Sequence, residues 1–73
     1  MFTPKDLATV DEHVAAGEQH VARQREIVQQ VSADPRLREL AERLLSEMEA
    51  ALKQHRLHRK DVLARMGAAQ EGD

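Results

Sequence analysis

The chain has 73 residues, of which 33% are charged, with a net charge of −2, no cysteine and one aromatic residue, Phe2. This length allows one domain at most, disulfides are excluded, and the balanced charge disfavours a nucleic-acid binder. No apolar run approaches the roughly 18 residues that span a bilayer, and the first twelve residues lack the pattern of a signal peptide. We therefore expect a cytoplasmic protein with no membrane segment.

The N-terminal sequence FTPKDL predicts the start of a helix. Thr3 can cap the helix, Pro4 suits its first position, and Asp6 has the spacing that completes a capping box. Phe2 and Leu7 have the spacing of a hydrophobic staple across this cap. The single aromatic residue is therefore expected to fix how the chain enters the helix.

An apolar seam follows along this helix, which we expect to span about residues 4–32. Its positions alternate spacings of three and four residues, as in a helix that faces a partner helix. They are Leu7, Val10, Val14, Gly17, Val21, Gln24, Val28 and Val31. Ile27 widens the apolar stripe, which suits a helix with more than one neighbour.

A tight turn is predicted at residues 32–35, where the sequence is SADP. Asp34 can cap a second helix and Pro35 can open it. Because the connection is so short, the two helices must fold back as an antiparallel hairpin. The second helix is expected over about residues 35–66, with Gly67 as its C-terminal cap and a frayed tail over residues 68–73.

The second helix carries a matching seam. The residues expected to face the first helix are Leu37, Ala41, Leu44, Met48, Ala51, His55, His58 and Val62, flanked by Leu40, Leu45, Leu52 and Met66. Folding back about the turn pairs residues whose numbers sum to about 68, so Val21 meets Met48 and Gly17 meets Ala51. The acidic start of the first helix then lies beside the basic residues of 53–65, which favours this register.

The apolar stripe is wider than a lone hairpin can cover, and a chain this short without disulfides commonly gains stability by associating. We therefore expect an all-α hairpin that dimerises into an antiparallel four-helix bundle. The residues expected at its interfaces are Val14, Gly17, Val21, Gln24, Ile27, Val28, Leu40, Leu44, Leu45, Met48 and Leu52. Leu40, Leu45, Leu52 and Ile27 are assigned to the interface between hairpins. The amide of Gln24, opposite Leu44, is expected to find its partner in the second hairpin.

Three histidines form a candidate site. The register places His13 across from His55, with His58 one turn further along, and three imidazoles can hold zinc with a fourth position open. We favour the alternative that they form a polar layer, which fixes the association state and responds to pH between about 5 and 7. We expect no cofactor and no bound metal.

The basic run KQHRLHRK, residues 53–60, places Lys53, Arg56 and Lys60 on one helix face, where they can contact phosphates. A dimeric hairpin of this size shares its architecture with Rop, an RNA-binding four-helix bundle. No aromatic side chain is available to stack a base, so we favour a solvated, structurally paired face. No cysteine or glycine-rich phosphate loop is present, and we expect no enzyme.

The segment HVAAGEQHVARQREIV, residues 13–28, resembles a family of short, uncharacterised alphaproteobacterial proteins. Their pattern is His-Val/Ile-x-x-Gly-x-x-His-Ile/Val-x-Arg-Gln-Arg, followed by a turn and a second helix with a further histidine, to which His55 corresponds. The chain departs from the family at Ala16 and His58, where many relatives have an acidic residue. The resemblance implies a helical hairpin and no particular activity.

The function that these patterns favour is a small self-associating structural or interaction protein, with a second helical protein as a possible partner. One alternative is a Rop-like nucleic-acid-binding regulator. The other is a bundle that binds metal through its histidines.

Overall fold

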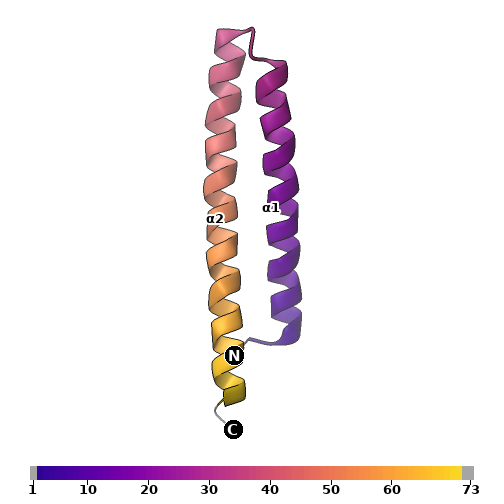
Figure 1. The fold of residues 1–73 in the computed structure, drawn as a ribbon, viewed down its shortest axis with the longest axis vertical. Coiled ribbons are helices and arrows are strands. Elements are labelled where there is room, and N and C mark those ends of the chain that lie inside the picture. Colours follow the sequence, from indigo (N-terminus) through magenta and orange to yellow (C-terminus); the bar gives the residue numbers. More distant parts are fainter. Residues whose placement is uncertain (1, 72–73) are drawn as a thin grey trace.

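The computed structural model describes the backbone of residues 2–71 and the side chains of residues 2–67. Two helices, α1 (Pro4–Gln30) and α2 (Pro35–Glu71), lie side by side as an antiparallel hairpin (Figure 1). The predicted all-α hairpin is confirmed. Its Cα atoms extend over 59 × 14 × 12 Å, so the molecule is a rod in which each helix has one neighbour.

The capping box predicted at the start of α1 is confirmed. The Thr3 hydroxyl accepts a hydrogen bond from the backbone N–H of Asp6 at 3.3 Å, and the Asp6 carboxylate accepts one from the N–H of Thr3 at 2.7 Å. The chain before this cap crosses towards α2 (Figure 1). The half-buried Phe2 ring therefore lies 5.9 Å from the His58 ring and 5.7 Å from the Arg65 guanidinium carbon. Its predicted pairing with Leu7 stays a prediction.

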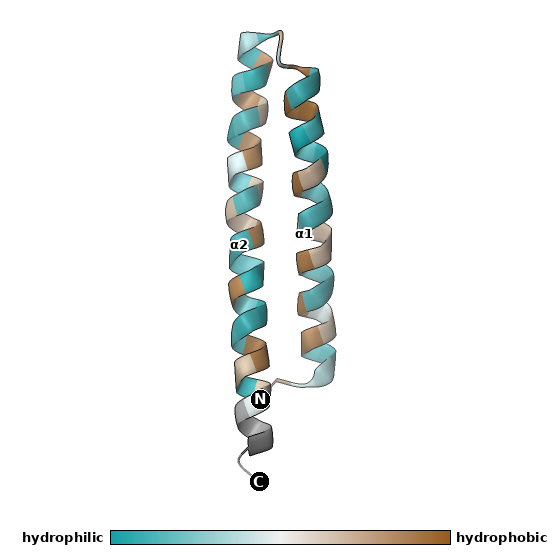
Figure 2. Cartoon of the chain, viewed as in Figure 1, coloured by the Kyte–Doolittle hydropathy of each residue, from teal (hydrophilic) through white to brown (hydrophobic). Residues whose placement is uncertain are grey.

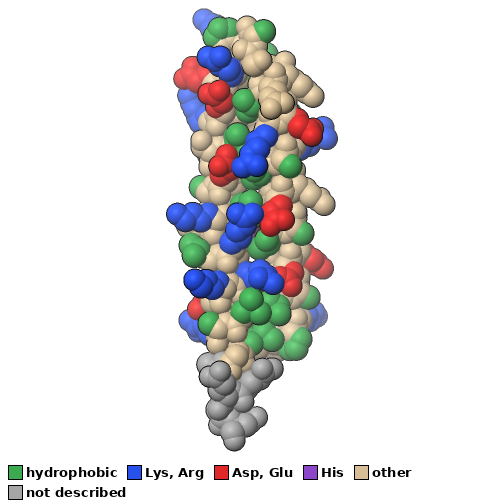
Figure 3. Space-filling model, in the orientation of Figure 1, with side chains coloured by type: hydrophobic (Ala, Val, Ile, Leu, Met, Phe, Trp, Pro, Cys, Tyr) green, Lys and Arg blue, Asp and Glu red, His purple; other side chains and the backbone are tan. Residues whose placement is uncertain are grey.

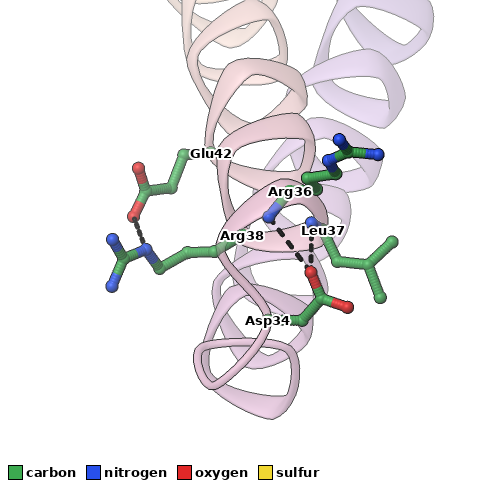
Figure 4. Close-up of polar contacts among 5 residues, drawn as sticks. All are labelled: Asp34, Arg36, Leu37, Arg38 and Glu42. Atoms are coloured by element: carbon green, nitrogen blue, oxygen red, sulfur yellow. Dashed lines mark hydrogen bonds and ion pairs between the residues drawn. The ribbon is translucent and has the colours of Figure 1, made fainter.

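Residues 31–34 form the turn, and α1 ends slightly before the predicted position. Asp34 caps α2 as expected, because its side-chain Oδ1 accepts hydrogen bonds from the N–H groups of Arg36 and Leu37 at 3.1 and 3.2 Å (Figure 4). The backbone carbonyl of Asp34 also accepts from the N–H of Arg38. The two bonds to the Asp34 side chain satisfy donors that a helix start leaves without intrahelical partners.

The seam predicted along α1 is confirmed. All of its positions are buried or half-buried, and Val10, Val21 and Gln24 are the most enclosed. Figure 2 shows apolar residues of α1 on the side that faces α2. The alternating spacings of three and four residues therefore predicted correctly which side of α1 faces α2.

The seam predicted along α2 is partly wrong. Ala41 and Val62 are buried and Met48 and His55 are half-buried, as expected. The other predicted positions, Leu37, Leu44, Ala51 and His58, are exposed. In their place Leu45, Leu52 and Met66 turn towards α1. Compared with the prediction, α2 is rotated about its own axis, so that these residues, which were expected beside the seam, complete the core.

The predicted end of α2 is also wrong, because the helix continues through Gly67 to Glu71. No glycine in the described part of the chain has a positive φ, so Gly67 does not form the left-handed cap that the sequence predicts. The residues after it, Ala-Ala-Gln-Glu, are good helix formers and allow the helix to go on. Residues 72 and 73 of the predicted frayed tail lie outside the described residues.

Over the described residues, neither helix combines the length and the apolar character that crossing a membrane requires.

Candidate interaction face

The hollows along one side of the hairpin are lined almost entirely by uncharged residues. Three successive hollows follow this side from the open end, where α1 begins, to the turn. They are lined by Phe2, Asp6, Thr9, Val10, His13, Gln54, His55 and His58; by Ala16, Gly17, His20, Met48, Ala51 and Leu52; and by Gln24, Ile27, Val31, Leu37, Leu40, Ala41 and Leu44. In a chain with 33% charged residues, Asp6 is the one Asp, Glu, Lys or Arg among them. We refer to these residues as the low-charge face.

The opposite side of the hairpin is charged. Its hollow is lined by Glu18, Val21, Arg25, Glu49, Leu52 and Arg56. Arg56 pairs with Glu18 across the two helices at 3.3 Å, and Arg59 pairs with Asp11. Figure 3 shows acidic and basic side chains spread over both helices on the surface that it draws. The two interhelical pairs agree with the register that the charge pattern predicted.

Leucines dominate the low-charge face near the turn. Leu37, Leu40 and Leu44 are 50%, 60% and 42% exposed, beside the half-buried Ile27 and Val31. The sequence assigned Leu44 to the seam within the hairpin and Leu40 to the interface between hairpins. Because α2 is rotated, both lie at the surface together with Leu37.

Gly17 and Leu52 are in close contact in the middle of the hairpin. A Cβ atom added to Gly17 would lie 3.0 Å from Cδ1 of Leu52, so the missing side chain makes room for this leucine. The prediction that Gly17 faces Ala51 is wrong about the neighbour, although Ala51 lines the same hollow. Leu52 is 5% exposed and belongs to the core of the hairpin, which corrects its assignment to the interface between hairpins.

The expected partner of Gln24 is also corrected. Its side-chain Nε2 donates a hydrogen bond to the backbone carbonyl of Ala41 at 2.9 Å, within the same hairpin. Among the described residues no buried side-chain polar atom is left without a partner. Gln24 therefore does not need a second hairpin.

All four histidines line the low-charge face, and His13 meets His55 as predicted. The centroids of these two rings are 5.4 Å apart. His58 instead packs edge-on against Phe2, and no three metal-binding side chains within the described residues are arranged to hold an ion. His13 and His58 are exposed and His55 is half-buried, so the hairpin alone contains no buried histidine layer.

Asp6, the single charged residue of the low-charge face, is held by the cap of α1. The backbone N–H of Thr3, and then its hydroxyl, donate to the carboxylate and lower the pKa of Asp6 below its ordinary value. The charge is thus tied to the helix end, and the sequence alone did not place it on this face.

No protein-family profile, curated protein or solved structure matches the chain. Its fold and surface define a helical hairpin with one charged and one low-charge face.

Proposed function

We propose that this chain is a small self-associating structural or interaction protein, and that it forms a homodimer by packing two low-charge faces together into a four-helix bundle. The observation that carries the proposal is the distribution of charge. A solvated helix face normally carries charged side chains, as the opposite side of this hairpin does. Here Leu37, Leu40 and Leu44 are exposed instead, at the end of a surface on which Asp6 is the one charge.

The hairpin alone has little core. Five apolar side chains are buried among the described residues, namely Val10, Val21, Ala41, Leu52 and Val62. A core of this size supplies at most ~3–5 kcal/mol without a further source of stability. With no cysteine in the sequence, burial against a second chain is the simplest source.

The size of the low-charge face suits a dimer. It follows one side of the rod over the length of α1, about 40 Å for 27 residues, and the rod is 14 Å wide, which corresponds to an area on the order of 600 Å². Specific protein interfaces of standard size bury about 600–1,000 Å² on each partner. Its end near the turn, with exposed Leu37, Leu40 and Leu44, is an apolar patch of the kind that marks interaction sites.

The structure gives no specific support to the two alternatives. Arg56 and Arg59, two of the four basic residues in the segment 53–60, pair with Glu18 and Asp11, whose negative charges reduce the attraction of this segment for phosphates. The histidines of one hairpin meet as a pair, and a zinc site needs at least three protein ligands.

Sedimentation equilibrium of the parent chain and two leucine variants tests the proposal. Leu40→Glu puts a charge on the low-charge face and is expected to raise the dimer Kd at least tenfold, because a buried unpaired charge is costly. Leu57→Glu is the matched control. Leu57 is 50% exposed and shares an outward face of α2 with exposed Lys53 and Lys60, so the dimer is expected to persist. Equal effects of the two substitutions would contradict the assignment of the face.

A further inference from the structure

Resting on the proposed dimer, we infer that the two hairpins pack with their turns at the same end, about a two-fold axis parallel to the helices. A two-fold axis in the plane of contact can run along the bundle or across it. The first places both turns at one end, and the second places them at opposite ends. In both cases adjacent helices are antiparallel, so helix direction does not decide between them.

The composition of the low-charge face along the rod decides between the two arrangements. Near the turn the face is aliphatic, with Ile27, Leu40 and Leu44. Near the open end it is more polar, because Asp6, His13, His55 and further polar side chains lie there beside Phe2 and Val10. The face is therefore not symmetric from end to end.

With both turns at one end, each residue of one hairpin lies beside residues of its copy that are equally far from the turn. α1 then lies against α2 of the copy, and Ile27 and Leu40 of the two chains cover each other as apolar surface. At the open end, His13 of one copy meets His55 of the other. Polar side chains are thus kept with polar side chains, and the leucines with leucines.

With turns at opposite ends, the two copies run in opposite directions along the rod, and Gly17 lies at the midpoint of the contact. Leu44 of one copy then falls at the level of His58 in the other, and Ile27 falls next to Asp6. Apolar side chains would then cover a carboxylate and imidazoles and remove them from water, which is unfavourable. Sliding the copies until only the leucine-rich ends overlap would give up most of the contact area.

A spin label at the turn measures which arrangement forms. The chain has no cysteine, so Ala33→Cys gives one labelling site, and this exposed residue of the turn lies off the low-charge face. Ala8→Cys, also exposed, provides the same measurement near the open end. Turns at the same end put both pairs of labels within about two helix spacings, ~20 Å. Turns at opposite ends, with Gly17 at the midpoint, put the Ala33 labels about 48 Å apart along the rod and the Ala8 labels about 27 Å apart, at ~1.5 Å per residue.

The distances are recorded by pulsed electron paramagnetic resonance, and the mass of the parent and labelled chains by sedimentation. A dimer with short distances at both sites supports the inference. A dimer whose Ala33 labels lie more than about 40 Å apart, with the Ala8 labels near 27 Å, overturns the inference and leaves the proposed dimer intact. A monomeric parent chain overturns the proposed function and the inference with it.

Discussion

Gln24 of α1 donates a hydrogen bond from its side-chain amide to the backbone carbonyl of Ala41 in α2, at 2.9 Å, and both residues are buried. A carbonyl oxygen has two lone pairs, so Ala41 can accept this bond in addition to its helical one. Because the Gln24 amide must reach this one carbonyl, the bond fixes the position of α1 along the axis of α2. The bond thus sets the register within the hairpin.

Gln24→Glu is expected to destabilise the hairpin by about 3 kcal/mol, because it replaces a buried donor with a carboxylate that faces a carbonyl oxygen. Gln19→Glu makes the same chemical change at an exposed position of α1 and should stay within about 0.5 kcal/mol of the parent. Urea unfolding followed by circular dichroism measures both. Equal stabilities of the two variants would show that the bond to Ala41 does not matter.

Gly17→Leu is expected to cost about 2 kcal/mol, because even a Cβ at this position would approach Leu52 within 3.0 Å. The cost arises in the contact between helices, since leucine is a better helix former than glycine. Ala15→Leu, at an exposed neighbouring position, is the control and should change the stability by less than about 0.5 kcal/mol. Thermal melts of both variants give the comparison, and a Gly17→Leu variant as stable as the parent would refute the close packing.

Asp6 should make the stability depend on pH in the acid range. Its folded-state pKa is lowered below that of an unfolded carboxyl, near 3.8, so its stabilising effect is present above this value and is lost as the pH falls through the folded-state pKa. Asp6→Asn is therefore expected to melt below the parent at pH 6 and to approach it between about pH 4 and pH 2. A melting difference that stays constant over this range would contradict the capping role of the carboxylate.

The pair Arg59–Asp11 is expected to couple α1 to α2 weakly. Both side chains are about half exposed, so the coupling energy should be about 0.5 kcal/mol and should shrink in 1 M salt. A double-mutant cycle with Asp11→Ala and Arg59→Ala measures it. Zero coupling at low salt would mean that the pair does not contribute to the register.

Much of the hairpin could be predicted from the sequence because its signals are local. Thr3 and Asp6 form the predicted capping box, Asp34 caps α2, and the seam of α1 is enclosed along its length. Each of these depends on residue spacing within one helix or one turn. The pairing of His13 with His55 follows from the length of the turn and the rise of a helix.

The rotation of α2 could not be predicted in the same way. This helix has apolar residues on both flanks of its seam, so periodicity alone does not say whether Leu44 or Leu45 faces α1. The packing of Leu52 against Gly17 fixes the rotation of α2. This contact depends on the shapes of both helices together and not on the spacing of residues within one of them. The low-charge face depends on this orientation of α2, because the rotation places the exposed leucines on the same side of the hairpin as the histidines.

If two low-charge faces bury each other, the parent chain must be a dimer, and its mass in solution shows whether it is. Sedimentation equilibrium at pH 7.5, over a range of micromolar concentrations, should give twice the 8.3 kDa of one chain. A folded helical protein that stays at 8.3 kDa over the whole range would mean that the low-charge face does not bind a second copy of the chain.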